Sequence, residues 1–406
     1  MTSNKELKIS LCIFFFCILL APSLFGQTEE AQRTIITAVP FLRIAPDARS
    51  SAMGDAGIAV ASDANSLYFN ASNLAFAEAD VGVSLTYTSW LRALGLNDTF
   101  LAYLAAYKKV GDNQAIGLGL RFFSIGQIQY TDNQGNALQT VNPYELAADL
   151  AYARKLGKNL SLGITIRYIM SNLGTASISG GAIIKPAHAF ATDLSLTYRK
   201  ALTIAKKKAV FSAGFVCSNL GTKVSYTDTG EKDYLPANLG VGCALEFYAD
   251  ERNSITLAFD INKMLVPTPP SQQIQDNNGN YIVNPAYDAN SDGIPDYKQH
   301  SMPASWFVSM GDAPNGVGEE FNELMFSLGL EYWYNKQFAI RCGYYYENEN
   351  KGNRQFFSIG LGIKYKIVNF NFSYLIPTTN GQRNPLDNTL RFSLLFNFGT
   401  SKSVTK

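Results

Sequence analysis

The chain repeats one pattern of hydrophobic and polar positions from residue 81 almost to its end. Between residues 390 and 398, every second residue is large and apolar, and most of the residues between them are polar. This period of two is the signature of a β-strand with one apolar face. Fourteen such stretches follow one another, at residues 81–88, 101–107, 116–122, 144–152, 160–168, 190–198, 211–217, 239–247, 255–262, 324–334, 338–346, 357–365, 370–376 and 390–398. We therefore expect an all-β fold.

A soluble sandwich and a transmembrane barrel could both produce this pattern. The polar faces hold Gly, Ser, Thr and Ala with isolated charges of both signs, such as Arg121, Asp149 and Arg167. A solvated sandwich face would hold more Lys and Glu, whereas small residues and paired charges suit a barrel lumen. An even strand number, with short turns alternating with longer loops, is typical of bacterial outer-membrane barrels. We expect an all-β transmembrane fold, a 14-stranded antiparallel outer-membrane β-barrel over residues 80–398.

The barrel interpretation makes further predictions about strand faces and sidedness. The last strand should pair with the first, and the short turns should lie in the periplasm. The apolar faces should contact lipid, including the face that holds Leu101 and Tyr103. Tyr residues at strand ends, among them Tyr87 and Tyr107, should form an aromatic belt at the membrane interface.

Composition supports a membrane barrel and argues against several other classes. Charged residues make up 17% of the chain, below the about 25% usual in soluble proteins, and aromatic residues make up 13%. Beyond the N-terminus, no apolar run is long enough for a membrane-spanning helix. The formal net charge of +1 gives no sign of a nucleic-acid partner. Three cysteines, Cys217, Cys243 and Cys342, lie on apolar faces, where we expect free thiols rather than a disulfide.

The two ends of the chain fall outside the repeated pattern. Residues 1–26 carry Lys5 and Lys8 before an apolar run from Ile9 to Leu20, which predicts a secretory signal peptide. Residues 27–79 are rich in small residues, and we expect short helices and turns packed against another part of the protein. Residues 399–406 are polar and should form a periplasmic tail.

The sequence shows no set of residues for catalysis. Its two histidines, His188 and His300, have no Ser, Cys or Asp pattern around them that predicts a nucleophilic or zinc site. We therefore expect no catalytic residues and a protein that is not an enzyme. Serine is abundant, so a triad scattered along the chain stays open as an alternative.

One loop has the oxygen spacing of a calcium site. Side-chain oxygens stand at its positions 1, 3, 5 and 9, on Asp288, Asn290, Asp292 and Asp296. With Gly293 at position 6, this spacing can wrap a hard cation such as Ca²⁺ in oxygen ligands. Position 12 is Gln299, where an EF-hand has Glu. Two interpretations stay open, a structural Ca²⁺ site and an Asp-rich turn without metal.

The same loop belongs to a connection of unusual length, residues 263–323. Connections this long are usually functional or disordered, and the barrel interpretation places this one on the extracellular side. It is rich in proline and aromatic residues, namely Pro269, Tyr281, Tyr287, Tyr297, Trp306 and Phe307. We expect these residues to bind a protein partner; an ordered lid over the barrel is the open alternative.

Two segments resemble a known protein family. The stretch from Pro46 through Met53-Gly54-Asp55-Ala56-Gly57 to YFNASNLAF at residues 68–76 resembles the N-terminal plug of the FadL-like outer-membrane family. The stretch SNLGTKVSY at residues 218–226, with YLPANL at 234–239, is similar to the PorV branch, outer-membrane components of the type IX secretion system. The resemblance extends over nearly the whole mature chain.

The resemblance implies a fold, a location and a function. It implies a barrel in the outer membrane of a Gram-negative cell, with residues 27–79 as its plug. It implies a shuttle that binds the SprA translocon, accepts secreted cargo through the cargo's C-terminal domain and delivers it to the PorU sortase complex. Outer-membrane lipid would be a further partner. Transport of hydrophobic small molecules, as elsewhere in the FadL-like group, is the alternative.

Overall fold

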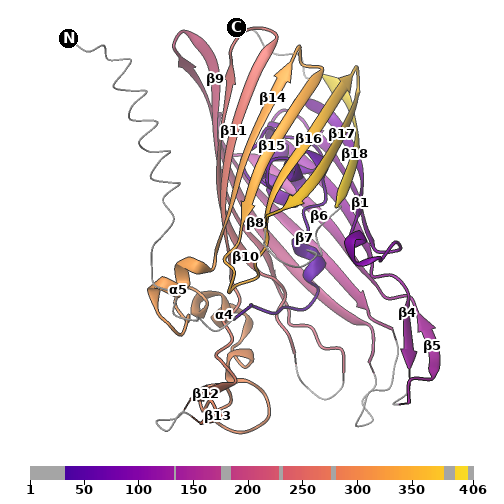
Figure 1. The fold of residues 1–406 in the computed structure, drawn as a ribbon. Helices are drawn as coiled ribbons and strands as arrows, with labels where there is room; N and C mark the ends of the chain where they lie inside the picture. The colour runs from indigo at the N-terminus through magenta and orange to yellow at the C-terminus, as the bar shows by residue number, and fades with distance from the viewer. Residues whose placement is uncertain are drawn as a thin grey trace. The chain divides into compact units, whose positions relative to one another are not determined.

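The structure is a computed structural model, and it describes residues 33–131, 134–174, 184–227, 232–275, 280–378 and 389–400. Within these residues, fourteen strands close into one antiparallel barrel (Figure 1). In chain order they are β1 (Ala79–Ser89), β2 (Phe100–Val110), β3 (Gln114–Ser124), β6 (Tyr144–Lys155), β7 (Leu160–Asn172), β8 (Ala187–Ile204), β9 (Lys207–Gly221), β10 (Asn238–Tyr248), β11 (Asn253–Met264), β14 (Leu324–Tyr334), β15 (Phe338–Tyr346), β16 (Gln355–Tyr365), β17 (Val368–Pro377) and β18 (Leu390–Thr400). The predicted 14-stranded barrel is confirmed.

Each barrel strand pairs with its neighbours along the chain, and the last strand closes the barrel on the first. Leu85 of β1 lies opposite Leu394 of β18, as the sequence predicted for the closing pair. β18 continues to Thr400, two residues beyond the predicted end of the barrel. The predicted signal peptide, residues 1–26, and the tail from residue 401 lie outside the described residues.

Alternation along the strands separates a lumen face from an outer face. On β16, Phe357, Ile359 and Leu361 are about half exposed, whereas Ser358 between them is buried. The exposed apolar side chains form the outer surface that a barrel presents to lipid. Cys217, Cys243 and Cys342 are free thiols, as predicted.

Strand β2 reverses the predicted faces. Leu101, Tyr103, Ala105 and Tyr107 are buried on the lumen side, where all four pack with residues of the N-terminal segment. Leu104 on the opposite face is the exposed one. The prediction was wrong because β2 is apolar on both faces, one for lipid and one for packing inside the barrel. Tyr107 therefore does not belong to an aromatic belt; its hydroxyl donates to the Ala79 carbonyl at 3.2 Å.

Residues 33–78, the N-terminal segment, fill the lumen as short helices and turns (Figure 1). Its elements are η1 (Pro40–Arg43), α2 (Ala48–Ser51), α3 (Ser66–Phe69) and η2 (Ala71–Phe76). Lumen side chains bind its backbone: Gly54 N donates to Ser358 Oγ at 2.9 Å, and Gly57 N donates to Asp260 Oδ2 at 2.7 Å. Small lumen residues therefore leave room for this backbone and supply its hydrogen-bond acceptors.

Glycine on β15 allows the closest approach between this segment and the wall. A Cβ atom on Gly343 would lie 2.1 Å from the backbone nitrogen of Gly54. Any side chain at this position would have to push the N-terminal segment away from the wall. The close contact between the N-terminal segment and the barrel wall therefore depends on the absence of a side chain at residue 343.

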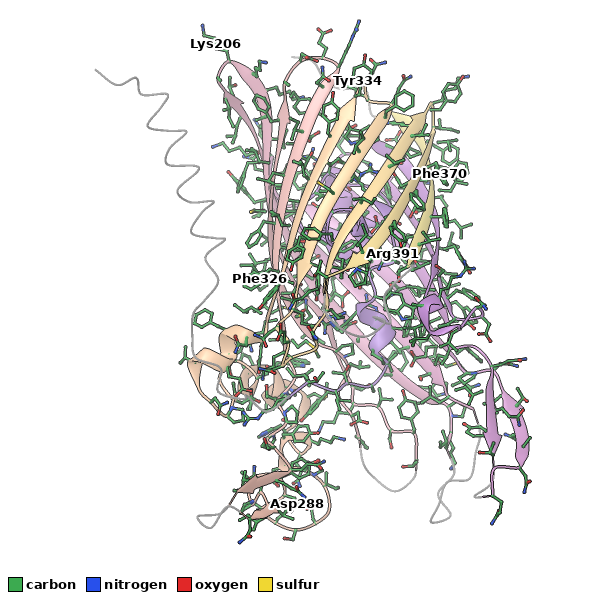
Figure 2. All side chains as sticks on the ribbon, in the orientation of Figure 1. Lys206, Asp288, Phe326, Tyr334, Phe370 and Arg391 are labelled. Atoms are coloured by element: carbon green, nitrogen blue, oxygen red, sulfur yellow. The ribbon has the colours of Figure 1, made fainter. Side chains whose placement is uncertain are left out.

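The barrel has two unlike ends. At one end, here the short-turn end, strands are joined at residues 111–113, 156–159, 205–206, 249–252, 335–337 and 366–367. The other end, the long-loop end, carries longer connections, one of which holds the hairpin of β4 (Ile128–Thr131) and β5 (Ala137–Val141) and another η3 (Arg92–Leu94). Figure 2 shows Lys206 and Tyr334 at the short-turn end and Asp288 at the long-loop end. In the described part of the chain, no helix is long and apolar enough to cross a membrane.

Candidate functional site at the long-loop end

The connection between β11 and β14 is built of regular elements. It contains a small hairpin of β12 (Gln273–Gln275) and β13 (Tyr281–Val283), then η4 (Asp296–Lys298), α4 (Met302–Val308) and α5 (Val317–Asn322) (Figure 1). Two backbone amides between the helices, Ala313 N and Asn315 N, donate to Glu320 and Glu319 of α5 at 2.9 and 3.0 Å. These bonds hold the connection between α4 and α5 against α5.

Large apolar side chains on these two helices, and on the turn that follows α4, face solvent. Phe307 is 78% exposed, Met310 51%, Val317 73% and Phe321 66%, and we call these four residues the α4–α5 surface. The spacing of four residues places Val317 and Phe321 on one side of α5, and Met310 follows Phe307 in the turn after α4. A group of large exposed apolar side chains outside the lipid-facing strands is a candidate interaction surface.

The acidic side chains of α5 face the opposite way and are all paired. Glu319 binds Arg33 at 2.7 Å and Lys351 at 2.6 Å, which ties α5 to the N-terminal segment and to the connection between β15 and β16. Glu320 binds Lys263 of β11 at 2.8 Å. The usual arrangement of a surface helix, apolar inside and charged outside, is therefore inverted here.

Hydrogen bonds set the ionisation of Glu319. Burial alone raises the pKa of its carboxyl, but the bonds from Lys351 Nζ and Asn315 N, with the charges of Lys351 and Arg33, outweigh that effect. The net result is a pKa below the usual 4.5, so Glu319 is ionised near neutral pH.

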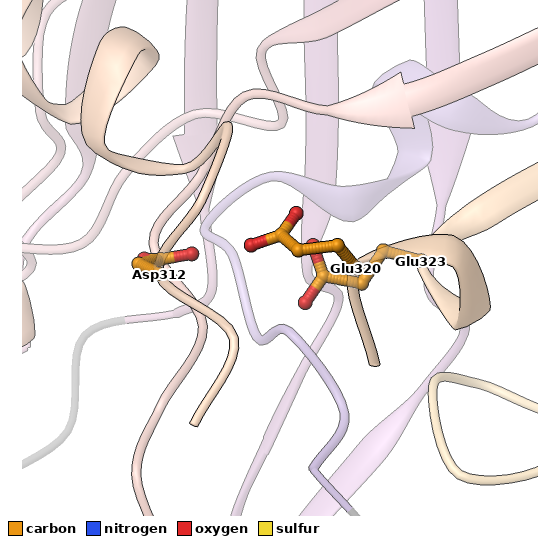
Figure 3. A group of neighbouring side chains, drawn as sticks. All are labelled: Asp312, Glu320 and Glu323. Carbon is orange, nitrogen blue, oxygen red and sulfur yellow. The ribbon is translucent and has the colours of Figure 1, made fainter. Parts of the chain in front are cut away.

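Three carboxylates converge where α5 meets the barrel rim (Figure 3). Oxygens of Asp312, Glu320 and Glu323 lie within 4.8 Å of one another. The ammonium group of Lys263 donates hydrogen bonds to both Glu320 and Glu323. It therefore supplies the positive charge that a metal ion would otherwise bring to these two carboxylates. Burial raises the pKa of Asp312 to about 6, although its carboxylate accepts a hydrogen bond from Thr268 N.

The structure distributes the six predicted partner-binding residues over several places. Phe307 belongs to the α4–α5 surface, whereas Trp306 and Pro269 are half-buried. Tyr287 and Tyr297 pack against each other, with ring centroids 6.2 Å apart. Tyr281 lies in β13.

Sequence reasoning missed Met310, Val317 and Phe321. The spacing of four between Val317 and Phe321, in a segment whose charged residues fall between them, is the signal that could have identified this surface.

The predicted calcium loop is closed by its own hydrogen bonds. Asp288 accepts from Gly293 N at 2.9 Å, and Gln299 Nε2 donates to Asp292 Oδ2 at 3.1 Å and to the Ile294 carbonyl at 2.8 Å. The amide of Gln299 thus contacts the oxygens at positions 5 and 7 that Ca²⁺ would need. Calcium binding would require this amide to turn away, and it stays a prediction.

Buried charges cross-link the lumen next to the N-terminal segment. Arg167 binds Asp149 at 2.6 Å and Asp193 at 2.7 Å, and Asp149 also binds Arg121 at 3.1 Å. A cavity of about 100 Å³ beside this network is lined by Arg121, Arg167 and Asp193 together with other polar and apolar side chains. These four lumen charges pair with one another, as their alternating positions predicted.

Known proteins share sequence and fold features with this chain. The family described as Type IX secretion system protein PorV matches residues 27–271, more than half of the chain. No curated protein sequence matches it.

Among solved structures, the toluene transporter TbuX of Ralstonia pickettii has 14% identity and a TM-score of 0.49, covering 87% of this chain and 98% of its own. A Pseudomonas aeruginosa FadL homologue has 10% identity and a TM-score of 0.44, covering 91% and 100%. The toluene transporter TodX of Pseudomonas putida has 14% identity and a TM-score of 0.46, covering 87% and 99%. The sequence match over residues 27–271 decides the relationship: the chain belongs to the PorV family of type IX secretion system proteins.

Proposed function

We propose that the protein is an outer-membrane shuttle of the type IX secretion system. In this role it binds an SprA-type translocon, accepts cargo through the cargo's C-terminal domain and delivers it to a PorU-type sortase complex. Family membership supports the secretion role. The partners are proposals that rest on the α4–α5 surface. With the short turns in the periplasm, this surface faces the cell exterior, where translocated cargo emerges.

The α4–α5 surface has the properties of a binding site. Burying a large apolar side chain stabilises a complex by about 1.5–3 kcal/mol, so four of them can dominate an interface. The salt bridges of Glu319 and Glu320 hold α5 in place before any partner arrives. Binding then costs little ordering entropy, which favours affinity. We propose this surface as the contact for the translocon.

Two other functions receive less support. Transport of hydrophobic small molecules needs an apolar path past the N-terminal segment, but buried ion pairs of Arg121, Asp149 and Arg167 stand there. For catalysis, Nδ1 of the exposed His188 shares a hydrogen bond with the Tyr168 hydroxyl, and in the described part of the chain no carboxylate is hydrogen-bonded to this histidine. We propose that the protein acts by binding and is not an enzyme.

Affinity purification from membranes tests the proposal. The double variant F307S/F321S in a tagged full-length chain should recover at least tenfold less translocon than the unchanged chain. The matched control is I282S/V283S, which makes the same kind of change at two exposed residues of β13 in the same connection. Heat-modifiable migration of both variants on gels shows that the barrels have folded.

The outcomes separate the hypotheses. Equal recovery of translocon by F307S/F321S and the control would move the contact away from the α4–α5 surface. Recovery of neither translocon nor secreted cargo by the unchanged chain would remove the shuttle function itself.

A further inference from the structure

A second cavity opens at the short-turn end of the barrel. Its volume is about 610 Å³, within the range of about 300–1,000 Å³ typical of ligand pockets. The N-terminal segment forms its floor, and the ends of β9, β10 and β14 to β18 form its walls. We call it the basic vestibule and define it by Lys208, Trp333, Lys336, Arg341, Lys364 and Lys366. Figure 2 shows that this end lies opposite the end that carries Asp288.

Cations outnumber anions in the vestibule. Seven cationic and four anionic side chains line it. Ion pairs account for the three arginines: Arg49 and Arg341 bind Glu331, and Arg199 lies 3.9 Å from Glu246. In the described part of the chain, the four lysines form no ion pair; Lys208 lies over the Tyr248 ring at 5.0 Å and Lys366 over the Tyr365 ring at 5.4 Å. The vestibule therefore holds an excess of positive charge that the protein itself does not neutralise.

A buried arginine adds a second sign of a missing acceptor. Arg341 is 1% exposed and donates from Nε to Glu331 at 2.6 Å and from Nη1 to Asn371 at 3.0 Å. Its Nη2 has no acceptor among the described residues. Buried polar groups are nearly always hydrogen-bonded, because leaving one unpaired destabilises the fold. An anionic group in the vestibule, after a small shift of the guanidinium, would supply that acceptor.

The position of the vestibule excludes membrane lipid as its natural occupant. Trp333 and Lys364 alternate with outward-facing Tyr334, Ile363 and Tyr365, so they point into the barrel. A lipid in the bilayer contacts the outer faces of these strands and is separated from the vestibule by the wall. The occupant must enter from the aqueous side of the short turns.

The distribution of the cations indicates how many charges the occupant carries. Lys336 and Lys366 lie on different turns, Lys364 is the next-to-last residue of β16, and Lys208 belongs to β9. A single phosphate could contact only part of this set, whereas a chain with several carboxylates could contact all of it. We propose that the basic vestibule binds an extended acidic peptide segment of a protein on the short-turn side of the membrane. This site is independent of the α4–α5 surface and of the proposed translocon contact.

Fluorescence anisotropy with a labelled hexaglutamate peptide tests this site on the full-length protein in detergent micelles. We expect saturable binding by the unchanged chain and at least tenfold weaker binding by K336Q/K364Q/K366Q. The matched control, K108Q/K158Q/K200Q, removes the same charge from exposed lysines at the same end that do not line the vestibule. It should bind within threefold of the unchanged chain.

Trp333 supplies a local reporter. The chain has three tryptophans, and only Trp333 lines the vestibule. Hexaglutamate should change the intrinsic emission of the protein and of W306F, but not that of W333F.

Three results would overturn the proposal. They are equal weakening in the two triple variants, no saturable binding of hexaglutamate, and full displacement of the peptide by millimolar inorganic phosphate. The last would assign the vestibule to a phosphate ligand. A failed translocon purification would leave all three readouts unaffected.

Discussion

At the scale of single residues, the lumen is held together by a few charged side chains that the fold brings into contact. Arg167 of β7 joins Asp149 of β6 and Asp193 of β8 across two strand pairings. All three side chains are buried, so each charge depends on its partner for stabilisation. Removing one member leaves the others uncompensated inside the barrel.

We predict that Arg167→Met strongly destabilises the barrel. Two buried carboxylates would lose their shared cation, a change that typically costs about 3–5 kcal/mol. Unfolding in denaturant, followed by heat-modifiable migration, measures the loss. Arg199→Met is the matched control, because Arg199 lies 3.9 Å from Glu246 in a partly exposed pair whose contribution is about 0–1 kcal/mol. Similar losses in both variants would contradict a special role for the buried network.

The partners of these charged residues could be predicted from the sequence only in part. Alternation identified Arg121, Asp149 and Arg167 as lumen residues that pair with one another, and they do. Asp260 was expected to behave likewise, but its carboxylate accepts hydrogen bonds from Gly57 N and Ile58 N. Its partner is backbone from a segment some 200 residues away in the chain, which no local pattern encodes.

At the scale of elements, α5 combines an exposed apolar side with an anchored acidic side. The anchor includes Glu319, whose pKa lies below its usual value in the folded protein. A carboxyl with a lowered pKa stabilises the fold fully above its unfolded pKa, and this stabilisation is lost as pH falls through the folded value.

We predict that α5 loosens as the pH falls below about 4.5, the ordinary pKa of Glu319. Asp312 works in the opposite direction: its raised pKa means that protonation near pH 6 favours the folded state, so no loosening should start there. Hydrogen-exchange protection factors of α5 amides between pH 7 and 3.5 measure the effect. E319Q should be less protected at pH 7 and should lose most of the pH dependence. A wild-type profile that is flat to pH 3.5 would contradict the anchor.

Calcium at the Asp288–Asp296 loop makes a separate prediction for this connection. At a Ca²⁺ concentration 100 times the Kd, binding would stabilise the loop by about 2.7 kcal/mol, or about 100-fold in its opening equilibrium. A chelator should then speed proteolytic cleavage of the loop by a similar factor in the unchanged protein, and D288N/D292N should show no response. Equal cleavage rates with and without chelator in the unchanged protein would remove calcium and leave a turn closed by hydrogen bonds.

The positions of the barrel strands were easier to predict than the packing partners of their side chains. The period of two located all fourteen barrel strands, because every strand has one face toward lipid. The same reasoning failed on β2, where the longer apolar side chains Leu101 and Tyr103 turn inward. It also missed α4 and α5, because helices of 7 and 6 residues contain at most one repeat of the helical spacing. In both cases the deciding partner is distant in sequence.

At the scale of the whole barrel, closure and filling act together. The β1–β18 pairing removes the exposed edges of the sheet, and the N-terminal segment fills the space that closure creates. The short-turn and long-loop ends are thereby separated by packed protein, with the basic vestibule on one side and the α4–α5 surface on the other. Such an arrangement suits a protein that binds different partners at its two ends without conducting solutes between them.

This separation predicts that the intact protein does not conduct. In planar bilayers, the unchanged chain should give no steady conductance, whereas Gly343→Val should open a leak. The new side chain would collide with Gly54, and overpacking of this kind costs about 1–3 kcal/mol, which displacement of the N-terminal segment relieves. Gly311→Val is the control, because a Cβ atom there meets no described atom within 4 Å. Conductance of the unchanged chain would instead favour small-molecule transport. A Gly343→Val variant without conductance would show that the N-terminal segment moves away from the new side chain without opening a path through the barrel.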